Sequence, residues 1–344
     1  MIDLDFFSSP IGLGHVTRDI AIANNFKDIS TKFVTGSGAA KILKNLDFKV
    51  DDVYIPPQFI IENGKMKNST RWLWNYYQYY KRCKKISEEI IQADKPRLVV
   101  SDEDFASLTV AHNKKIPTVL ITDIVQTNFV NGITSFIEKK MNKSMQKIMK
   151  KCDVVIIPEN GSDEGNIKRV GPIVRQTNFS RDELRKKFSF DKKTIVVSVG
   201  GTDAGLYLIE KTLESISKIN SDVDVIVVSG PSLSKKFGDT VRNLGFVDNL
   251  HEIIFAADVI VSLAGKSTID ESRAYGTPGI FIPIKGHFEQ EDNAREEGFA
   301  FEDIYKLDEL ILEKLGQKRN PLQTNGAINA YNIIKNLIHN RSNP

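Results

Sequence analysis

Short β-branched apolar runs alternate with longer amphipathic stretches along this chain, and this alternation restricts its fold more than any other feature. The apolar runs predict strands buried on both faces, and the amphipathic stretches predict helices that cover a sheet. Strand, crossover helix and strand in succession are typical of a parallel sheet. In the first half we expect strands at Asp3–Phe7, Thr31–Val34, Arg97–Val100, Thr118–Ile121 and Asp153–Ile157, and helices at Val16–Phe26, Ala39–Leu46, Trp72–Ala93 and Ile133–Lys150.

The alternation pauses at Val170–Arg175, where Gly171-Pro172 interrupts the pattern, and then begins again. The second set of expected strands is Thr194–Val199, Val223–Val228, Val241–Gly245, Asp258–Ser262 and Gly279–Ile282. A length of 344 residues fits two domains. We therefore expect an α/β protein with two doubly wound Rossmann-like domains, residues 1–172 and 173–325, facing each other across a cleft, and a terminal helix in 326–344. Ligands of such domains bind at the carboxyl ends of the strands.

The composition excludes several classes of protein. A net charge of +3 is too small for a dedicated nucleic-acid binder, so we expect no nucleic-acid partner. Cys83 and Cys152 are the only cysteines, which excludes a disulfide framework and favours a reducing cytoplasm. The start of the chain lacks the pattern of a signal peptide, and no apolar run approaches the ~20 residues that span a bilayer. We expect a cytoplasmic protein.

A first glycine loop, residues 8–15, follows the first expected strand and ends in Gly12-Leu13-Gly14-His15. A dinucleotide fingerprint needs a third glycine, where this chain has Thr17, and an acidic residue after the second strand, which is missing. These two departures argue against a nicotinamide enzyme. The loop instead brings His15 to the edge of the sheet, and the alternative is that His15 only caps the following helix.

Two further loops in the second half can bind an anion. Gly200 and Gly201 let backbone amides approach an oxyanion closely, although an ordinary strand-to-helix turn is the alternative. Gly265-Lys266-Ser267-Thr268 resembles a P-loop, but position 260 is Ile where that motif requires Gly. The segment still predicts a helix amino terminus with a lysine, which suits a diphosphate.

Three segments of the second half resemble the donor half of glycosyltransferase family 28: residues 255–271, Gly276-Thr277-Pro278 and residues 287–294. Gly12–His15 and Gly200–Thr202 fall where that family has its glycine loops. The resemblance implies the GT-B fold and inverting transfer from a UDP-sugar co-substrate, with no cofactor and no metal. It further implies N-acetylglucosamine as the sugar and a lipid-linked acceptor at the cytoplasmic face of the membrane.

The resemblance also implies which residues bind the donor. Glu271 would bind the ribose hydroxyls, and the alternative is a solvated charge on a helix. The backbone of Phe246 and Val247 would bind uracil. The remaining expected donor-binding residues are Gly14, Gly200, Gly201, Thr202, Ala264, Gly265, Lys266, Ser267 and Thr268 near the diphosphate, and Glu289, Gln290 and Asn293 at the sugar hydroxyls.

His15 is the expected catalytic base, because an unperturbed histidine has a pKa near 6.5 and related GT-B enzymes use a histidine there. Those enzymes orient the histidine with a carboxylate at the end of a neighbouring strand. Asp102 or Glu103 would do so here, with Asp102 preferred, while one carboxylate of 102–104 caps the helix Phe105–Asn113. Asp102 and Asp104 alone make a poor metal site, so we expect no metal. Lys266 and the helix amino termini would stabilise the leaving diphosphate.

The region 133–151 predicts a basic amphipathic helix with an apolar stripe, which suits an anionic membrane surface. The alternative is a helix that covers the sheet and exposes its lysines. An aromatic run between Trp72 and Tyr80 is a second candidate interface.

Two other functions remain open at this point: a UDP-sugar hydrolase that uses His15 to activate water, and a donor-binding subunit without activity of its own.

Overall fold

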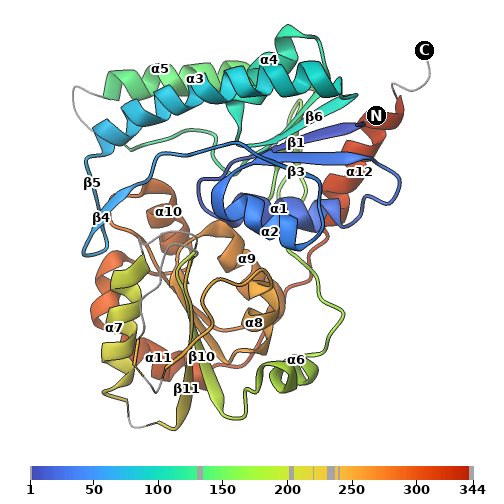
Figure 1. The fold of residues 1–344 in the computed structure, drawn as a ribbon. Coiled ribbons are helices and arrows are strands. Elements are labelled where there is room, and N and C mark those ends of the chain that lie inside the picture. The colour runs from blue at the N-terminus through green and yellow to red at the C-terminus, as the bar shows by residue number, and fades with distance from the viewer. Residues whose placement is uncertain are drawn as a thin grey trace. The chain divides into compact units, whose positions relative to one another are not determined.

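The computed structural model describes residues 2–129, 135–200, 205–219, 221–230, 237–238 and 241–340. The chain forms two compact units. Unit 1 comprises residues 1–58, 68–174 and 324–344, and unit 2 comprises residues 59–67 and 175–323. Figure 1 shows the elements of both units.

Unit 1 contains a seven-stranded sheet in the order β3-β2-β1-β6-β7-β8-β9, in which every pair of neighbours is parallel. Its strands are β1 Leu4–Ser8, β2 Thr31–Thr35, β3 Val50–Asp52, β6 Leu98–Asp102, β7 Thr118–Ile121, β8 Val154–Ile157 and β9 Ile167–Arg169. Its helices are α1 Gly14–Ala23, α2 Ser37–Asn45, α3 Ser69–Asp94, α4 Phe105–Asn113, α5 Ser135–Met149 and α12 Gly326–Asn340. Helices α3, α4 and α5 cover one face of the sheet, and α1, α2 and α12 cover the other (Figure 1).

The apolar runs account for the centre of this sheet but not for its edges. The strand Thr118–Ile121 and the helix Phe105–Asn113 have the expected bounds. The edge strands β3 and β9 were not expected, because Val50-Asp51-Asp52 and Ile167-Lys168-Arg169 are largely polar. An edge strand is bonded to one neighbour only and is partly exposed, so it does not need a continuous apolar run.

Unit 2 contains a five-stranded parallel sheet in the order β12-β11-β10-β13-β14. Its strands are β10 Lys193–Ser198, β11 Val223–Val228, β12 Val241–Asn243, β13 Val259–Leu263 and β14 Gly279–Ile282. Its helices are α6 Arg181–Phe188, α7 Leu206–Ile216, α8 Leu250–Ala256, α9 Lys266–Tyr275, α10 Phe288–Glu296, the 3-10 helix η3 Phe301–Tyr305 and α11 Leu307–Gly316. Separate apolar clusters fill the two faces of this sheet. The expected α/β class with parallel sheets is confirmed in both units.

Two segments belong to a different unit from the residues that precede them in the sequence. The hairpin of β4 Ile60–Glu62 and β5 Lys65–Lys67 lies between β3 and α3 in the sequence, yet it belongs to unit 2. The terminal helix α12 packs on α1 of unit 1, where the rings of Phe26 and Tyr331 lie 5.6 Å apart. The chain therefore passes between the units four times.

Helix α5 covers the sheet of unit 1 with only part of its apolar stripe. Met145 and Met149 are buried in the cluster that contains Leu108 and Leu120, whereas Phe136 is 72% exposed and Ile137 is 55% exposed. Residues 133 and 134, at the start of the expected helix, lie outside the described residues. Glu138 and Asn142 are also buried, because Glu138 accepts a hydrogen bond from the Phe129 amide and Asn142 bonds Thr127. Within the described residues, no helix has the length and apolarity needed to cross a bilayer.

Candidate active site

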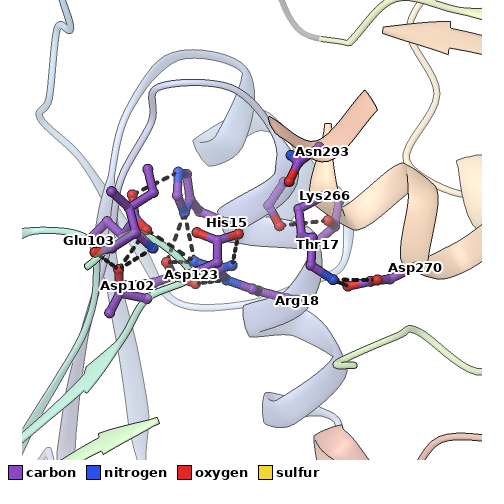
Figure 2. Close-up of polar contacts among 12 residues, drawn as sticks. His15, Thr17, Arg18, Asp102, Glu103, Asp123, Lys266, Asp270 and Asn293 are labelled. Carbon is purple, nitrogen blue, oxygen red and sulfur yellow. Dashed lines mark hydrogen bonds and ion pairs between the residues drawn. The ribbon is translucent and has the colours of Figure 1, made fainter. Parts of the chain in front are cut away.

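His15 and Asp102 lie at the carboxyl ends of two adjacent parallel strands of unit 1. Residues Ser8 of β1 and Asp102 of β6 are direct neighbours in the sheet, and His15 follows the loop after β1 as the second residue of α1. The Nδ1 atom of His15 lies 2.8 Å from Oδ1 of Asp102 (Figure 2). Strand order reverses between β1 and β6, and such a reversal is where doubly wound sheets bind their ligands.

Arg18 binds the same carboxylate from the next turn of α1. Its Nε atom donates to Oδ2 of Asp102 at 2.5 Å, and its Nη2 atom donates to Oδ1 at 2.6 Å. Nη1 donates to Asp123, which follows β7, at 3.0 Å. Asp102 is completely buried and Arg18 is 4% exposed, so the guanidinium keeps this carboxylate ionised away from water.

Glu103 approaches the other nitrogen of His15, with 3.8 Å between its Oε2 atom and Nε2. Its backbone is left-handed, with φ 56°, and its Oε1 atom accepts a hydrogen bond from Thr122 at 2.8 Å. Burial and the neighbouring charge of Asp123 raise the pKa of Glu103 well above its usual range. Asp104 caps α4 by accepting from the amides of Ala106 and Ser107, as one carboxylate of this group was expected to do.

The pKa of His15 differs from the unperturbed value that the sequence suggested. Burial lowers this pKa, but the charge and hydrogen bond of Asp102 outweigh burial and raise it to about 9. The pKa of Asp102 is lowered, because Arg18 and His15 together outweigh the effect of its burial. Burial and the charge of Asp102 raise the pKa of Asp19, a buried residue of α1. In the free protein, His15 is therefore an imidazolium at neutral pH.

In unit 2, the loop after β13 leads into α9, and Gly265 is the N-cap residue of that helix. Lys266, Ser267 and Thr268 form the first turn, so their amides belong to the positive end of the helix. The Nζ atom of Lys266 lies 2.5 Å from Oδ1 of Asp270, one turn further along α9 (Figure 2). The lysine expected at the diphosphate is thus already paired with a carboxylate of its own helix.

Glu271 is buried in unit 2, so the alternative of a solvated helix charge is wrong. Its Oε1 atom accepts from Nε of Arg175 at 2.9 Å. The same guanidinium donates from Nη1 to the carbonyl of Asp248 at 2.6 Å, and the hydroxyl of Tyr275 donates to the carbonyl of Arg175. Arg175 therefore connects Glu271 to the loop that contains Phe246 and Val247, the residues expected at uracil.

The other expected donor residues lie on separate elements of the chain. Gly200 follows β10 with φ 73°, while Gly201 and Thr202 lie outside the described residues. Glu289 lies in the first turn of α10. Gln290 of the same helix accepts from the amide of Ile284 through Oε1, and Asn293 donates to the carbonyl of Ala264 at 3.1 Å. Gly14 begins α1, and its carbonyl accepts from Thr17.

The sequence analysis did not single out Arg18, Asp123 or Arg175, which belong to these clusters. Two signals could have identified the pair in unit 1. Arg18 is three residues after His15 and so lies on the same helix face, and Asp123 follows an expected strand at the edge that already contained Asp102. For Arg175 the only signal was its place at the end of the segment Val170–Arg175. Within the described ranges, no group of three or more histidine, cysteine, aspartate and glutamate residues has a geometry that could hold a metal ion.

This chain is similar to glycosyltransferases in sequence and in fold. Residues 194–339 match the family model described as the glycosyltransferase family 28 C-terminal domain. An uncharacterized glycosyltransferase of Methanosarcina acetivorans is 30% identical over 239 residues, which are 62% of this chain and 61% of that protein. The matched regions of the first curated relatives span only 60–61% of their lengths.

The chain is similar over a longer region to a protein of Clostridium botulinum, UDP-N-acetylglucosamine--N-acetylmuramyl-(pentapeptide) pyrophosphoryl-undecaprenol N-acetylglucosamine transferase. It is 25% identical over 342 residues, covering 93% of this chain and 90% of the relative. Among solved structures, the glycosyltransferase of kitacinnamycin matches 97% of this chain and 98% of its own, with a TM-score of 0.65 and 12% identity. That likeness shows the GT-B fold.

Proposed function

We propose that this chain, whose residues 194–339 match the family model of the glycosyltransferase family 28 C-terminal domain, is an inverting glycosyltransferase that moves a sugar from a UDP-sugar to an acceptor hydroxyl. The observation that carries the proposal is the 2.8 Å pair of His15 and Asp102 at the carboxyl edge of β1 and β6. A histidine oriented by a buried carboxylate is what a general base requires.

In the proposed reaction, the acceptor oxygen attacks the anomeric carbon of the sugar. The bond from that carbon to the diphosphate oxygen breaks, and UDP leaves with the bonding electrons. The acceptor proton moves to Nε2 of His15, while the Nδ1 hydrogen donates to Asp102. Since the pKa of His15 is about 9, only about 1 in 100 free molecules has the neutral imidazole at pH 7. Alkaline conditions should therefore favour the reaction.

The donor would bind to unit 2. Glu271 already gives one carboxylate oxygen to Arg175, and the other can accept from the ribose hydroxyls. The first turn of α9 would receive the diphosphate, where Lys266 can exchange Asp270 for the more highly charged phosphates. Glu289, Gln290 and Asn293 would bind the hydroxyls of the sugar. We propose no metal for this reaction.

The name of the Clostridium botulinum relative favours N-acetylglucosamine as the sugar and a lipid-linked acceptor, and we extend both to this chain. We also propose that unit 1 contacts a membrane. Phe136 and Ile137 of α5 are exposed beside Lys139, Lys140 and Lys143, and on α3 Trp74 is 61% exposed and Tyr77 is 48% exposed. Exposed aromatic residues next to lysines suit an anionic, cytoplasmic bilayer surface.

Donor turnover tests the proposal most directly. The purified chain is mixed with a panel of nucleotide sugars, with and without a membrane lipid extract, and the release of nucleoside diphosphate is followed. Release from one UDP-sugar that requires lipid supports the transferase and its lipid acceptor. Equal release without lipid would indicate a hydrolase that uses His15 to activate water. No turnover despite UDP binding would contradict an independent enzyme and favour a donor-binding subunit.

Two histidine variants then test the proposed base. His15→Ala should lower kcat by about 10³, since general-base catalysis contributes roughly 10²–10⁴. The affinity for UDP should not change, because His15 is not among the expected donor-binding residues. His339→Ala is the matched control, since this residue is exposed near the end of α12 and should retain full activity. Retention of wild-type kcat by His15→Ala would refute the role of this histidine.

A further inference from the structure

The hairpin of residues 59–67 carries an inference about sugar recognition. Its strands β4 and β5 are antiparallel and are joined by Asn63-Gly64. Both turn residues have positive φ, 50° for Asn63 and 72° for Gly64, as a tight type I′ hairpin turn requires. The hairpin comes from the first half of the sequence but is part of unit 2.

The backbone of this hairpin is bonded to the loop that follows β14. The amide of Met66 donates to the carbonyl of Lys285 at 2.8 Å, and the amide of Lys285 donates to the carbonyl of Gly64 at 2.9 Å. At the start of the hairpin, the ring of Phe59 meets the ring of His287 edge-on at 5.2 Å. The hairpin therefore lies along residues 285–287 of unit 2 and contacts them through its backbone and through Phe59.

The same loop is bonded on its other side by the helix of the proposed sugar-binding residues. The amide of Ile284 donates to Oε1 of Gln290 at 3.0 Å, and the amide of Gly286 donates to Oε1 of Glu291 at 2.9 Å. With Oε1 engaged, the Nε2 amino group is the donor that Gln290 can offer to a sugar hydroxyl. The position of that group depends on the loop 284–287.

The tip of the hairpin fits closely between two aromatic rings. A Cβ atom at Gly64 would lie 2.8 Å from a ring carbon of Tyr207 and 2.9 Å from one of Phe301. The ammonium groups of Lys65 and Lys285 lie 5.8 and 5.5 Å from the centre of the Phe301 ring, a cation–π arrangement. The hairpin is thus packed against the rest of unit 2 and hydrogen-bonded to it.

We propose that the hairpin 59–67 is a positioning element for the sugar of the nucleotide-sugar donor, an inference that rests on the proposed function. It fixes the loop 284–287, and the loop fixes Gln290 at the start of α10. Sugar recognition then depends on a segment far outside the family domain of residues 194–339. Recognition of the nucleotide should not depend on it, since Arg175 and Glu271 are bonded to different segments.

Gly64→Ala tests this inference, with Gly165→Ala as the matched control. Both glycines have positive φ, 72° and 57°, but a Cβ at Gly165 would meet nothing within 4 Å. Both variants place an alanine at a position with positive φ, and only Gly64→Ala displaces the hairpin tip. Cooperative thermal unfolding of each variant verifies that the fold is kept. Calorimetry then compares the affinities for UDP and UDP-N-acetylglucosamine, and hydrogen exchange follows the amides of residues 284–287.

We expect faster exchange at residues 284–287 in Gly64→Ala alone. The Kd for the UDP-sugar should rise about tenfold, while the Kd for UDP changes less than about twofold. Unchanged exchange, or faster exchange with an unchanged UDP-sugar Kd, would overturn the inference. If the wild-type chain binds no UDP-sugar at all, the proposed function fails and the role in sugar recognition fails with it. The exchange data then report separately that the hairpin holds the loop.

Discussion

The charge clusters around His15 and around Glu271 are both buried, yet they balance their charges differently. In unit 1, four carboxylates surround two cationic groups: Asp19, Asp102, Glu103 and Asp123 lie near His15 and Arg18. In unit 2, Arg175 pairs with Glu271, and Lys266 pairs with Asp270. An excess of negative charge in a buried place is relieved by proton uptake.

This difference shows which cluster is suited to proton transfer. The pKa values of His15, Asp19 and Glu103 are all raised, so folding favours the protonated form of each group. Such perturbed groups at the ligand-binding edge of a sheet are typical of catalytic sites. The paired charges of the second cluster suit the binding of a ligand that keeps its charge. Three experiments can break or sharpen the contrast.

The largest effect is expected from Arg18→Gln, which removes the guanidinium bonded to Asp102. Removing one partner of a buried ion pair leaves the other charge buried without compensation. The free energy of unfolding should fall by about 3 kcal/mol. The matched control in unit 2 is Arg181→Gln, since Arg181 pairs with Asp258 but both side chains are about a quarter exposed, at 26% and 24%. That loss should stay below about 1 kcal/mol. Urea unfolding measures both values, and equal losses would refute the contrast in burial.

The next largest effect concerns pH. Neutral His15 forms only as pH rises through about 9, so kcat/KM should fall about fiftyfold from pH 9 to pH 7. Asp102→Asn removes the carboxylate charge that raises the pKa of His15. The rise of kcat/KM with pH should therefore occur at lower pH in this variant. Affinity for UDP should stay constant over the same range, because His15 is not among the expected donor-binding residues. A flat kcat/KM profile from pH 7 to pH 9 would contradict a raised pKa of the catalytic base.

The smallest effect is expected from Glu271→Gln, which keeps the shape of the side chain but removes its charge. A weaker hydrogen bond to the ribose should reduce the affinity for UDP about tenfold. Glu252→Gln provides the control, because Glu252 is another buried, paired carboxylate of unit 2 with no expected donor contact. Calorimetry with UDP distinguishes them. Equal losses in the two variants would mean that Glu271 acts only through the stability of unit 2.

The sequence predicted those contacts that follow from the direction of parallel strands and from local chemistry. Parallel strands place their carboxyl ends at one edge, so the loop after β1 and the acidic residues after β6 had to meet there. The preference for Asp102 over Glu103 agrees with the 2.8 Å contact, and a carboxylate of the group 102–104 caps α4 as predicted. The donor-binding roles assigned by resemblance stay predictions.

What the sequence by itself determined was the α/β class, the two sets of parallel strands and the loops that carry the polar residues. These follow from local periodicity and from short-range turn chemistry, which each segment contains in full. Only the tertiary structure decided that hairpin 59–67 belongs to unit 2, that Arg175 reaches Glu271, and that the pKa of His15 rises to about 9. Each of these depends on contacts between residues distant in the sequence and on burial, and the free energy of a buried charge is set by neighbours that no local pattern specifies.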